Sequence, residues 1–418
     1  MSIQYQLTDV MQKAVLYPWS AILGHSHQLV THPNYPLRDT WLGRLQAATL
    51  ESTARLLGHY PKRPYGIDEC IADGRVVPVT ERTVLKKPFC HLLQFATEGA
   101  VDRPKVLIIA ALSGHHATLS RETYSAFLPD HDVYVTDWQD ARYVPMSDGR
   151  FGFEDYVRYV IEFLEHVGPE THVVAICQAA APVLTAVAVM AARQHPHRPE
   201  SLTLMAGPID VRANPNMLTR VSELSNARLH RWLTIKTVPV GYPGAGRRVY
   251  PGMLQLAAFM SLNPRTHWQK HKQFFFDVLN GEEQAAAKHR EFYNEYFAVL
   301  DMTEEYFIET LERVFFDPQL SKGTMQYQDA TVDCGAITDV PLFTIEGAED
   351  DMCKVGMTAA AHGLCPSLPP EMHRQYVQPG VGHYGVFSGT RYREEVAPRI
   401  KAFMATQSRS QRALSGAM

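Results

Sequence analysis

One stretch decides the fold of this chain: Val173-Val174-Ala175-Ile176-Cys177-Gln178-Ala179-Ala180-Ala181-Pro182-Val183. It passes without a break from an apolar, β-branched run, typical of a buried strand, to an alanine-rich run, typical of a helix. Cys177 stands at the junction, with the small residues Ala175 and Ala179 two positions away on either side. Pro182 fits the first turn of a helix, where a missing N–H leaves no hydrogen bond unmade. The junction therefore predicts a tight strand-to-helix turn that presents the Cys177 side chain.

Runs with strand character lie on both sides of this junction, at residues 74–85, 89–97, 105–112, 132–136, 201–205, 340–347 and 375–379. The run 105–112 is apolar along its centre, which is typical of a parallel strand buried on both faces. Helical patterns occur at residues 153–166, 179–193 and 392–405. This alternation predicts right-handed βαβ units and an α/β fold with a doubly wound, mostly parallel sheet.

The chain divides into five expected parts. These are an N-terminal helical extension (1–73), the first part of the α/β core (74–210), an inserted helical cap or lid (211–334), the second part of the core (335–405) and a flexible tail (406–418). The extension has apolar residues at helical spacing. The cap is set apart by its aromatic, helix-like pieces, and the tail by its Ser, Gln and Arg content.

Composition excludes several classes of protein. The 418 residues carry a net charge of −4 without a basic, aromatic-rich stripe, which argues against a nucleic-acid partner. We see no signal peptide and no apolar run that could span a bilayer. The six cysteines are scattered without zinc-binding spacing, so we expect free thiols, a cytoplasmic location and no metal.

Two later residues give Cys177 a chemical meaning. In an α/β-hydrolase the nucleophile lies in a G-x-S-x-G turn, and the acid and the histidine follow in that order along the chain. Here a thiol takes the nucleophile position, Asp350 follows a strand that ends in Gly347, and His383 precedes the last helix. Taken alone, a Cys among apolar residues is usually part of the core, but this order favours catalysis. Asp351 is an alternative acid, because a pattern cannot separate adjacent carboxylates.

Backbone donors and a pocket are expected around this set. The oxyanion hole should use the N–H of Gln178 and one from the loop after strand 105–112, at His115 or Gly114. The same loop, with Ser113, is expected to contact substrate. Asp137 and Trp138 follow the strand 132–136, where ligands bind in α/β folds, so we predict that they line the pocket.

Several longer segments resemble the intracellular poly(3-hydroxybutyrate) depolymerases, the short-chain-length polyhydroxyalkanoate depolymerase family. They span most of the chain and include residues 112–115, 128–134, 136–138, 140–142, 177–178, 207–210, 214–215, 241–251 and 379–387. The run Pro-Gly-Val-Gly-His-Tyr-Gly-Val-Phe at 379–387, which adds Tyr384 to the expected substrate contacts, is the most specific. This chain departs from the family where Ala179 replaces Pro and where Met352-Cys353 replaces Ile-Ser.

The resemblance implies a cytoplasmic enzyme that acts on native, amorphous polyester granules through Cys177, Asp350 and His383. It implies no cofactor. Water would release 3-hydroxybutyrate or its oligomers, whereas coenzyme A as a co-substrate would release 3-hydroxybutyryl-CoA. The alternatives are a polyhydroxyalkanoate synthase, which uses the same residue types, and a non-catalytic granule-coat protein. The sequence does not indicate an oligomeric state.

Overall fold

The computed structural model describes residues 2–99, 102–216, 219 and 226–407. A nine-stranded sheet organises these residues, in the order β1-β2-β3-β5-β4-β6-β7-β13-β14. Strands β5, β4, β6, β7, β13 and β14 run parallel to one another. Strands β1, β2 and β3 form an antiparallel edge that joins β5. The strands are β1 (Glu69–Ala72), β2 (Arg75–Lys87), β3 (Cys90–Thr97), β4 (Lys105–Ile109), β5 (Asp132–Trp138), β6 (Thr171–Ile176), β7 (Ser201–Met205), β13 (Leu342–Gly347) and β14 (His373–Gln378). This order confirms the predicted α/β-hydrolase fold class.

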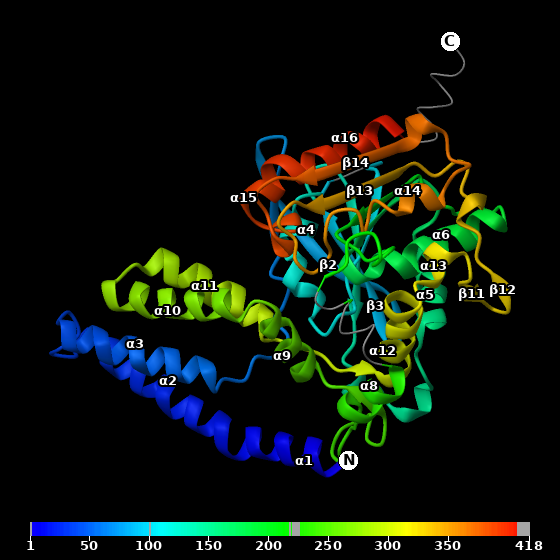
Figure 1. The fold of residues 1–418 in the computed structure, drawn as a ribbon. Coiled ribbons are helices and arrows are strands. Elements are labelled where there is room, and N and C mark those ends of the chain that lie inside the picture. The colour runs from blue at the N-terminus through cyan, green and yellow to red at the C-terminus, as the bar shows by residue number, and fades with distance from the viewer. Residues whose placement is uncertain (1, 100–101, 217–218, 220–225, 408–418) are drawn as a thin grey trace.

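Helices cover both faces of the sheet. In Figure 1, α5 (Phe153–Val167) and α6 (Ala180–Ala192) lie to the right of the sheet, whereas α4 (Arg121–Ser125) and α15 (Gly389–Arg391) lie to its left. The last helix, α16 (Ala397–Gln407), packs on β13 through Phe403, whose ring lies 5.1 Å from that of Phe343. The predicted tail begins inside α16, and residues 408–418 lie outside the described residues.

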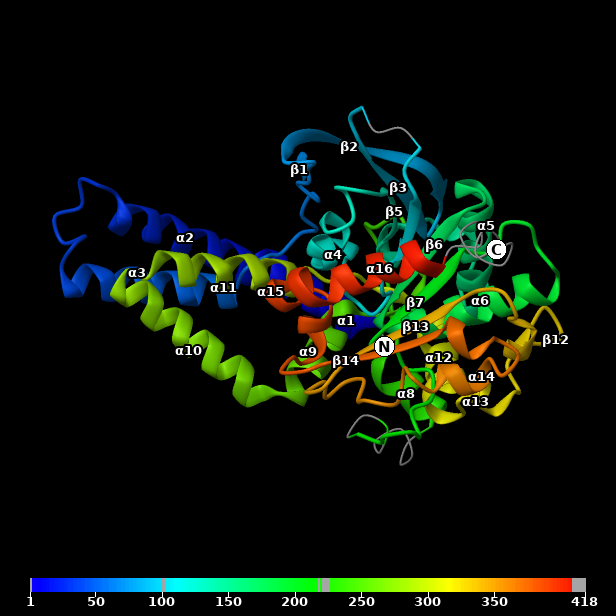
Figure 2. The same cartoon turned by 90° about the horizontal axis from the view of Figure 1, so that it is seen from above.

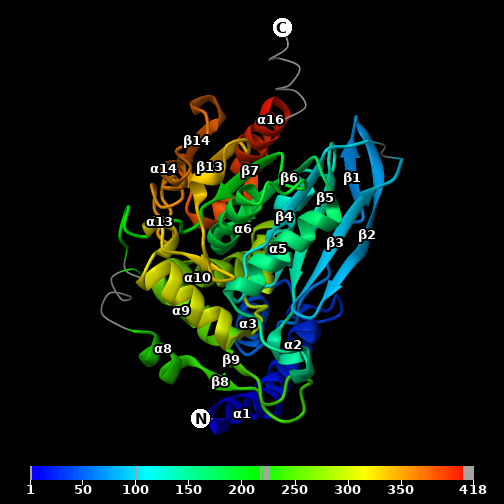
Figure 3. The same cartoon turned by 90° about the vertical axis from the view of Figure 1, so that its right-hand side faces the viewer.

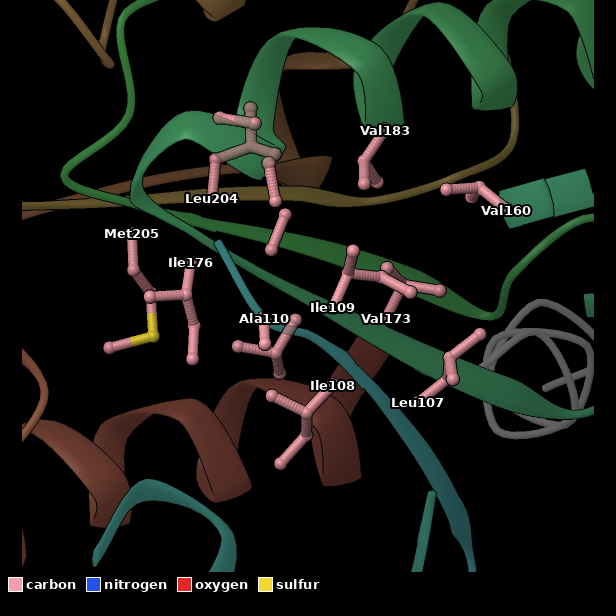
Figure 4. Close-up of a cluster of buried hydrophobic side chains, with 14 of the residues drawn as sticks. Leu107, Ile108, Ile109, Ala110, Val160, Val173, Ile176, Val183, Leu204 and Met205 are labelled. Atoms are coloured by element: carbon pink, nitrogen blue, oxygen red, sulfur yellow. The ribbon is translucent and has the colours of Figure 1, made fainter. Parts of the chain in front are cut away.

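The core is densest around the strand-to-helix junction. Figure 4 shows side chains of β4, β6 and β7 meeting Val160 of α5 and Val183 of α6. Every residue of β6 is buried, and nearly all of α6 is buried around its whole circumference. A helix apolar on all sides belongs in the interior of a large domain. The core therefore holds the start of α6 in a fixed position.

The N-terminal helices and part of the insertion form one arm, seen on the left in Figures 1 and 2. It consists of α1 (Ser2–Met11), a π-helical turn (Gln12–Leu16), α2 (Tyr17–Thr31), α3 (Trp41–Leu56), α10 (Pro264–Asn280) and α11 (Glu283–Tyr296). Helix α3 packs on both α2 and α10. The Arg55 guanidinium donates to the Asn294 side chain at 2.9 Å, and Arg290 pairs with Glu51 at 2.5 Å. The predicted extension (1–73) is too long at its end, because β1 already belongs to the sheet.

The rest of the insertion packs on the core. Strands β8 (Lys236–Thr237), β9 (Arg248–Tyr250) and β10 (Met302–Thr303) form a small antiparallel sheet. Tyr306 in α12 (Glu304–Thr310) stacks on Tyr156 of α5 at 5.5 Å. The insertion also contains α8 (Ala227–Thr234), α9 (Gly252–Leu262), α13 (Gln319–Lys322), β11 (Gln326–Tyr327) and β12 (Ala330–Thr331), whereas α14 (Ala361–Leu364) belongs to the second part of the core. Figure 3 shows α8, α9 and β8 below the strands of the main sheet.

Candidate active site

Cys177 occupies a strained turn between β6 and α6. Its φ of +52° lies in the left-handed region that most side chains avoid, so the surrounding packing must hold it there. Gly207, just after β7, packs directly against this turn. A Cβ at Gly207 would lie 2.2 Å from the Cβ of Ala180 and 2.5 Å from the carbonyl oxygen of Cys177. The turn is thus fixed by close backbone contacts as well as by the strand and the helix.

The structure brings Cys177, His383 and Asp350 together. The Nε2 atom of His383 lies 3.2 Å from the Cys177 Sγ, and its Nδ1 lies 2.7 Å from Oδ2 of Asp350. The other carboxylate oxygen of Asp350 accepts hydrogen bonds from the backbone N–H groups of Met352 (2.9 Å) and Cys353 (2.8 Å). These donors fix the plane of the carboxylate that faces the imidazole.

The adjacent carboxylate points elsewhere. Asp351 accepts a hydrogen bond from the Asn263 side chain, at the start of α10, and is exposed. Of the two acids that the sequence left open, Asp350 is therefore the one beside His383.

Charge and burial act in opposite directions on His383. Burial by itself lowers the pKa of this imidazole, but the neighbouring Asp350 and Cys177 raise it more, and the net pKa is well above its ordinary value. The ring is 6% exposed, so little water screens these charges. The pocket consequently favours an imidazolium that faces the Cys177 sulfur, an arrangement that stabilises a thiolate.

The loop after β4 is attached to the inserted segment. Gly114 has a φ of +92°, and a Cβ there would come within 2.8 Å of the Gln255 side chain in α9. Its carbonyl accepts from the N–H of Leu300 at 2.9 Å, and His115 forms an isolated bridge with Val299. Insertion residues thus fix the backbone of the loop where the second oxyanion donor is expected.

The His115 side chain is a packing group. Its ring lies 5.6 Å from Phe259 and 5.0 Å from Tyr296, and burial lowers its pKa to about 4. It is therefore neutral near pH 7. Among the described residues, no cluster of three or more His, Cys, Asp or Glu side chains could hold a metal ion.

A cavity of about 880 Å³ opens above Cys177 and His383. Ser113, His115, Cys177, Gln178, His383 and Tyr384 are among the residues that line it. Leu and Phe side chains from α8, α9, α11 and α12 supply much of the remaining wall. A largely apolar cavity with a few convergent polar groups is typical of a site for a small or flexible apolar ligand.

The prediction for Asp137 and Trp138 is wrong, because neither residue lines this cavity. Asp137 is buried, pairs with Lys62 at 2.5 Å and accepts from the Tyr65 hydroxyl at 3.0 Å. Trp138 is fully buried and donates its indole N–H to the Ala110 carbonyl at 2.8 Å. The segment before β1 closes the end of β5, so both side chains are structural. Gly114 also lies outside the lining, although its backbone shapes the loop that follows β4.

The sequence analysis did not predict a role for Glu346, which stabilises the loop that follows Asp350. This buried carboxylate on β13 accepts hydrogen bonds from three backbone N–H groups, those of Gly356 (2.9 Å), Thr358 (2.8 Å) and Ala359 (3.1 Å). The Thr358 hydroxyl in turn accepts from the N–H of Gly207 at 2.9 Å. Glu346 therefore links the loop after Asp350 to the residue that packs on the Cys177 turn. Its signal was a carboxylate inside the apolar run 340–347.

Comparisons with solved structures found low sequence identity over most of the chain. A carboxylesterase from Bacillus subtilis is 13% identical, with a TM-score of 0.38, and the match covers 86% of this chain and 97% of that one. A monoacylglycerol lipase from Paleococcus ferrophilus is 12% identical, with a TM-score of 0.43, and the match covers 76% and 99% of the two chains. A hydrolase from Pseudomonas aeruginosa is also 12% identical, with a TM-score of 0.44 and coverage of 78% and 98%. A comparison with curated proteins found no significant match.

None of the helices in the described ranges has both the length and the apolar character needed to cross a membrane.

Part of the sequence matches one known family. Residues 206–408 match the family described as the PHB de-polymerase C-terminus, a region that contains both Asp350 and His383. The protein is a carboxylic ester hydrolase with the α/β-hydrolase fold, and this later part of the chain is similar to the polyhydroxybutyrate depolymerases.

Proposed function

We propose that this enzyme hydrolyses the ester bonds of amorphous poly(3-hydroxybutyrate) granules through a thioester on Cys177. One observation carries the proposal: the Cys177 sulfur lies 3.2 Å from His383 Nε2, inside a cavity of about 880 Å³. The family match supports a polyester as the substrate. The free state of all six cysteines supports a reducing compartment, as a granule in the cytoplasm would require.

The first half of the reaction forms the acyl-enzyme. The Cys177 thiolate attacks an ester carbonyl carbon, and the C=O electrons move onto the oxygen. The N–H of Gln178, with that of His115 or Gly114, stabilises this oxyanion; one such donor contributes about 3–4 kcal/mol in comparable sites. The His383 imidazolium then protonates the departing alkoxide, the C–O ester bond breaks, and a thioester remains.

The second half releases the acid. His383, now neutral, takes a proton from a water molecule that attacks the thioester carbonyl. The tetrahedral adduct collapses, the C–S bond breaks, and the proton on His383 restores its ion pair with the thiolate. Asp350 holds the imidazole tautomer and stabilises its charged form in both halves.

The size and polarity of the cavity suit an uncharged aliphatic polyester. A site of this volume holds a segment of a flexible chain rather than the bulk of a granule. The enzyme must therefore draw single chain segments from the polymer surface into the cavity.

The test compares Cys177→Ala with Cys70→Ala, which removes a half-buried thiol on β1 that does not line the cavity. We expect Cys177→Ala to abolish acid release from amorphous granules, and Cys70→Ala to retain the wild-type rate. Iodoacetamide should block the wild type and label Cys177. Unchanged release by Cys177→Ala would refute catalysis at this thiol.

Analysis of the products shows whether water or coenzyme A accepts the acyl group. Mass spectrometry of the products with and without coenzyme A distinguishes 3-hydroxybutyrate from 3-hydroxybutyryl-CoA. Polymer growth from 3-hydroxybutyryl-CoA without granule hydrolysis would instead identify a synthase.

A further inference from the structure

A row of exposed apolar side chains follows the N-terminal helix. Helix α1, the π-turn and α2 form one nearly continuous helical rod along the lower edge of the arm in Figure 1. Its exposed row runs over most of a length of about 45 Å, at 1.5 Å per residue. The exposed fractions range from 42% at Val15 to 69% at Leu29. The row consists of Leu7, Met11, Val15, Trp19, Ile22 and Leu29.

The spacing of these residues places them on one face. Successive members are three, four or seven residues apart, which are the steps that keep side chains aligned on a helix. The π-turn at Gln12–Leu16 holds more residues per turn than an α-helix, so repeated steps of four from Leu7 to Trp19 stay on the same side.

The opposite face is attached to the body of the protein. Tyr5 donates a hydrogen bond to Asp301, and the Tyr242 hydroxyl donates to Asp9 at 2.6 Å. Farther along, the Ser20 hydroxyl donates to the Ala54 carbonyl at 2.8 Å. The apolar row is therefore presented outward by a helix whose other side is already fixed.

The row is also nearly free of charge. Asp9 and Lys13 are the only Asp, Glu, Lys or Arg residues between positions 2 and 31. They lie 3.0 Å from each other, and Lys13 contacts the Tyr242 hydroxyl at 2.5 Å, so both belong to the attached side. Large exposed apolar patches are rare on soluble proteins unless they bind something.

We propose that this apolar row docks the enzyme on the surface of the amorphous polyester, an inference that rests on the proposed function. The lack of charged residues beside the row favours a polyester surface over anionic lipid or a second copy of the chain. A helix that binds anionic lipid carries Lys and Arg beside its apolar face, and a helix that pairs with a second copy carries charged residues beside the seam that set its register. This row has neither the basic residues of a lipid-binding helix nor the charged residues of a helix seam. Binding to an uncharged, structureless polyester surface requires no such charges.

The row leads toward the cavity. Helix α1 contacts β8, and the helix just before β8, α8, contributes Leu233 and Thr234 to the cavity wall. Trp232 on the same helix is 63% exposed. In Figure 1, α8 lies beside the start of α1. Docking through the row thus holds one wall of the cavity near the polymer surface.

The experiment uses the full chain with the triple variant Met11→Gln, Trp19→Gln and Ile22→Gln. Glutamine keeps helix propensity without adding charge. The control replaces two exposed residues at the β1–β2 edge of the main sheet, Ile71→Gln and Val76→Gln, which are 67% and 63% exposed. Circular dichroism checks that both variants fold.

Sedimentation with amorphous granules is the main measurement, beside the hydrolysis of soluble 3-hydroxybutyrate oligomers. We expect the triple variant to bind granules at least tenfold more weakly and to hydrolyse them correspondingly slowly at low granule concentration. Its rate on soluble oligomers should stay within twofold of the wild type, and the control should match the wild type in both assays.

Three results would overturn the inference. They are equal granule binding by the triple variant, wild-type binding to anionic phospholipid vesicles as tight as to granules, and a wild-type dimer by light scattering that the triple variant converts to a monomer. A wild type that sediments with granules but hydrolyses neither granules nor oligomers would instead contradict the proposed function and leave the docking surface standing.

Discussion

Replacing Asp350 with Asn, beside the same change at Asp351, tests the site through two neighbouring carboxylates. Asp350 accepts hydrogen bonds on both oxygens, one at 2.7 Å from His383 and the other from two backbone N–H groups. An amide has only one acceptor oxygen. Its NH₂ group must therefore face either the imidazole or the backbone donors. In both orientations His383 loses the carboxylate charge that raises its pKa.

The expected effect is large for one variant and small for the other. Loss of the carboxylate behind a catalytic imidazole lowers kcat by about 10⁴ in a comparable triad. At 1.36 kcal/mol per tenfold, this corresponds to roughly 5 kcal/mol of transition-state stabilisation. Asp351 is hydrogen-bonded to Asn263 and not to His383, so Asp351→Asn should stay within about threefold of the wild type.

Initial rates of acid release at saturating granule concentration measure both variants, with thermal unfolding as a check on the fold. The reasoning fails if Asp351→Asn loses activity as strongly as Asp350→Asn. It also fails if Asp350→Asn, properly folded, keeps more than a tenth of the wild-type kcat.

Three further predictions concern the surroundings of this set. Gly207→Ala should destabilise the fold by about 1–3 kcal/mol through overpacking and slow hydrolysis, whereas Gly363→Ala, with open space around its Cβ, should be neutral or stabilising; chemical denaturation and initial rates check both. Glu346→Gln should lower the free energy of unfolding by roughly 1–3 kcal/mol, because its new NH₂ group would be a buried donor without an acceptor, and an unchanged denaturation midpoint would contradict this. Because the pKa of His383 is raised in the folded state, its charge stabilises the fold fully below about pH 6.5, and this stabilisation is lost as the pH rises through the raised pKa. The difference in unfolding free energy between the wild type and His383→Gln should therefore shrink toward alkaline pH, and a constant difference would oppose the assignment.

The central strands were predictable because their signals are local. The expected strand 201–205 coincides with β7, and the strand-to-helix turn at Cys177 lies where the apolar run at 173–176 meets the alanine-rich run. Buried parallel strands read as continuous apolar runs, so their positions follow from composition alone. The order of Cys177, Asp350 and His383 along the chain was also visible, because this fold presents its reactive groups in a fixed order.

The contacts between distant segments were not predictable. Nothing in residues 1–73 indicates that α3 packs on α10, since both helices are amphipathic surface helices with many acceptable partners. The position of Asp137 at the end of β5 suggested a ligand site, but Lys62 from a separate segment neutralises it there. The pattern could not separate Asp350 from Asp351, because the choice depends on the direction in which each side chain leaves one turn.

The hydrogen bond between Leu300 and Gly114 ties the loop after β4 to the position of the inserted segment. A displacement of the insertion wide enough to admit a polymer segment would part these two residues and leave the loop after β4 without that support. The thiol would then meet an ester before the oxygen-stabilising groups were in place, and bond cleavage would wait for reclosure.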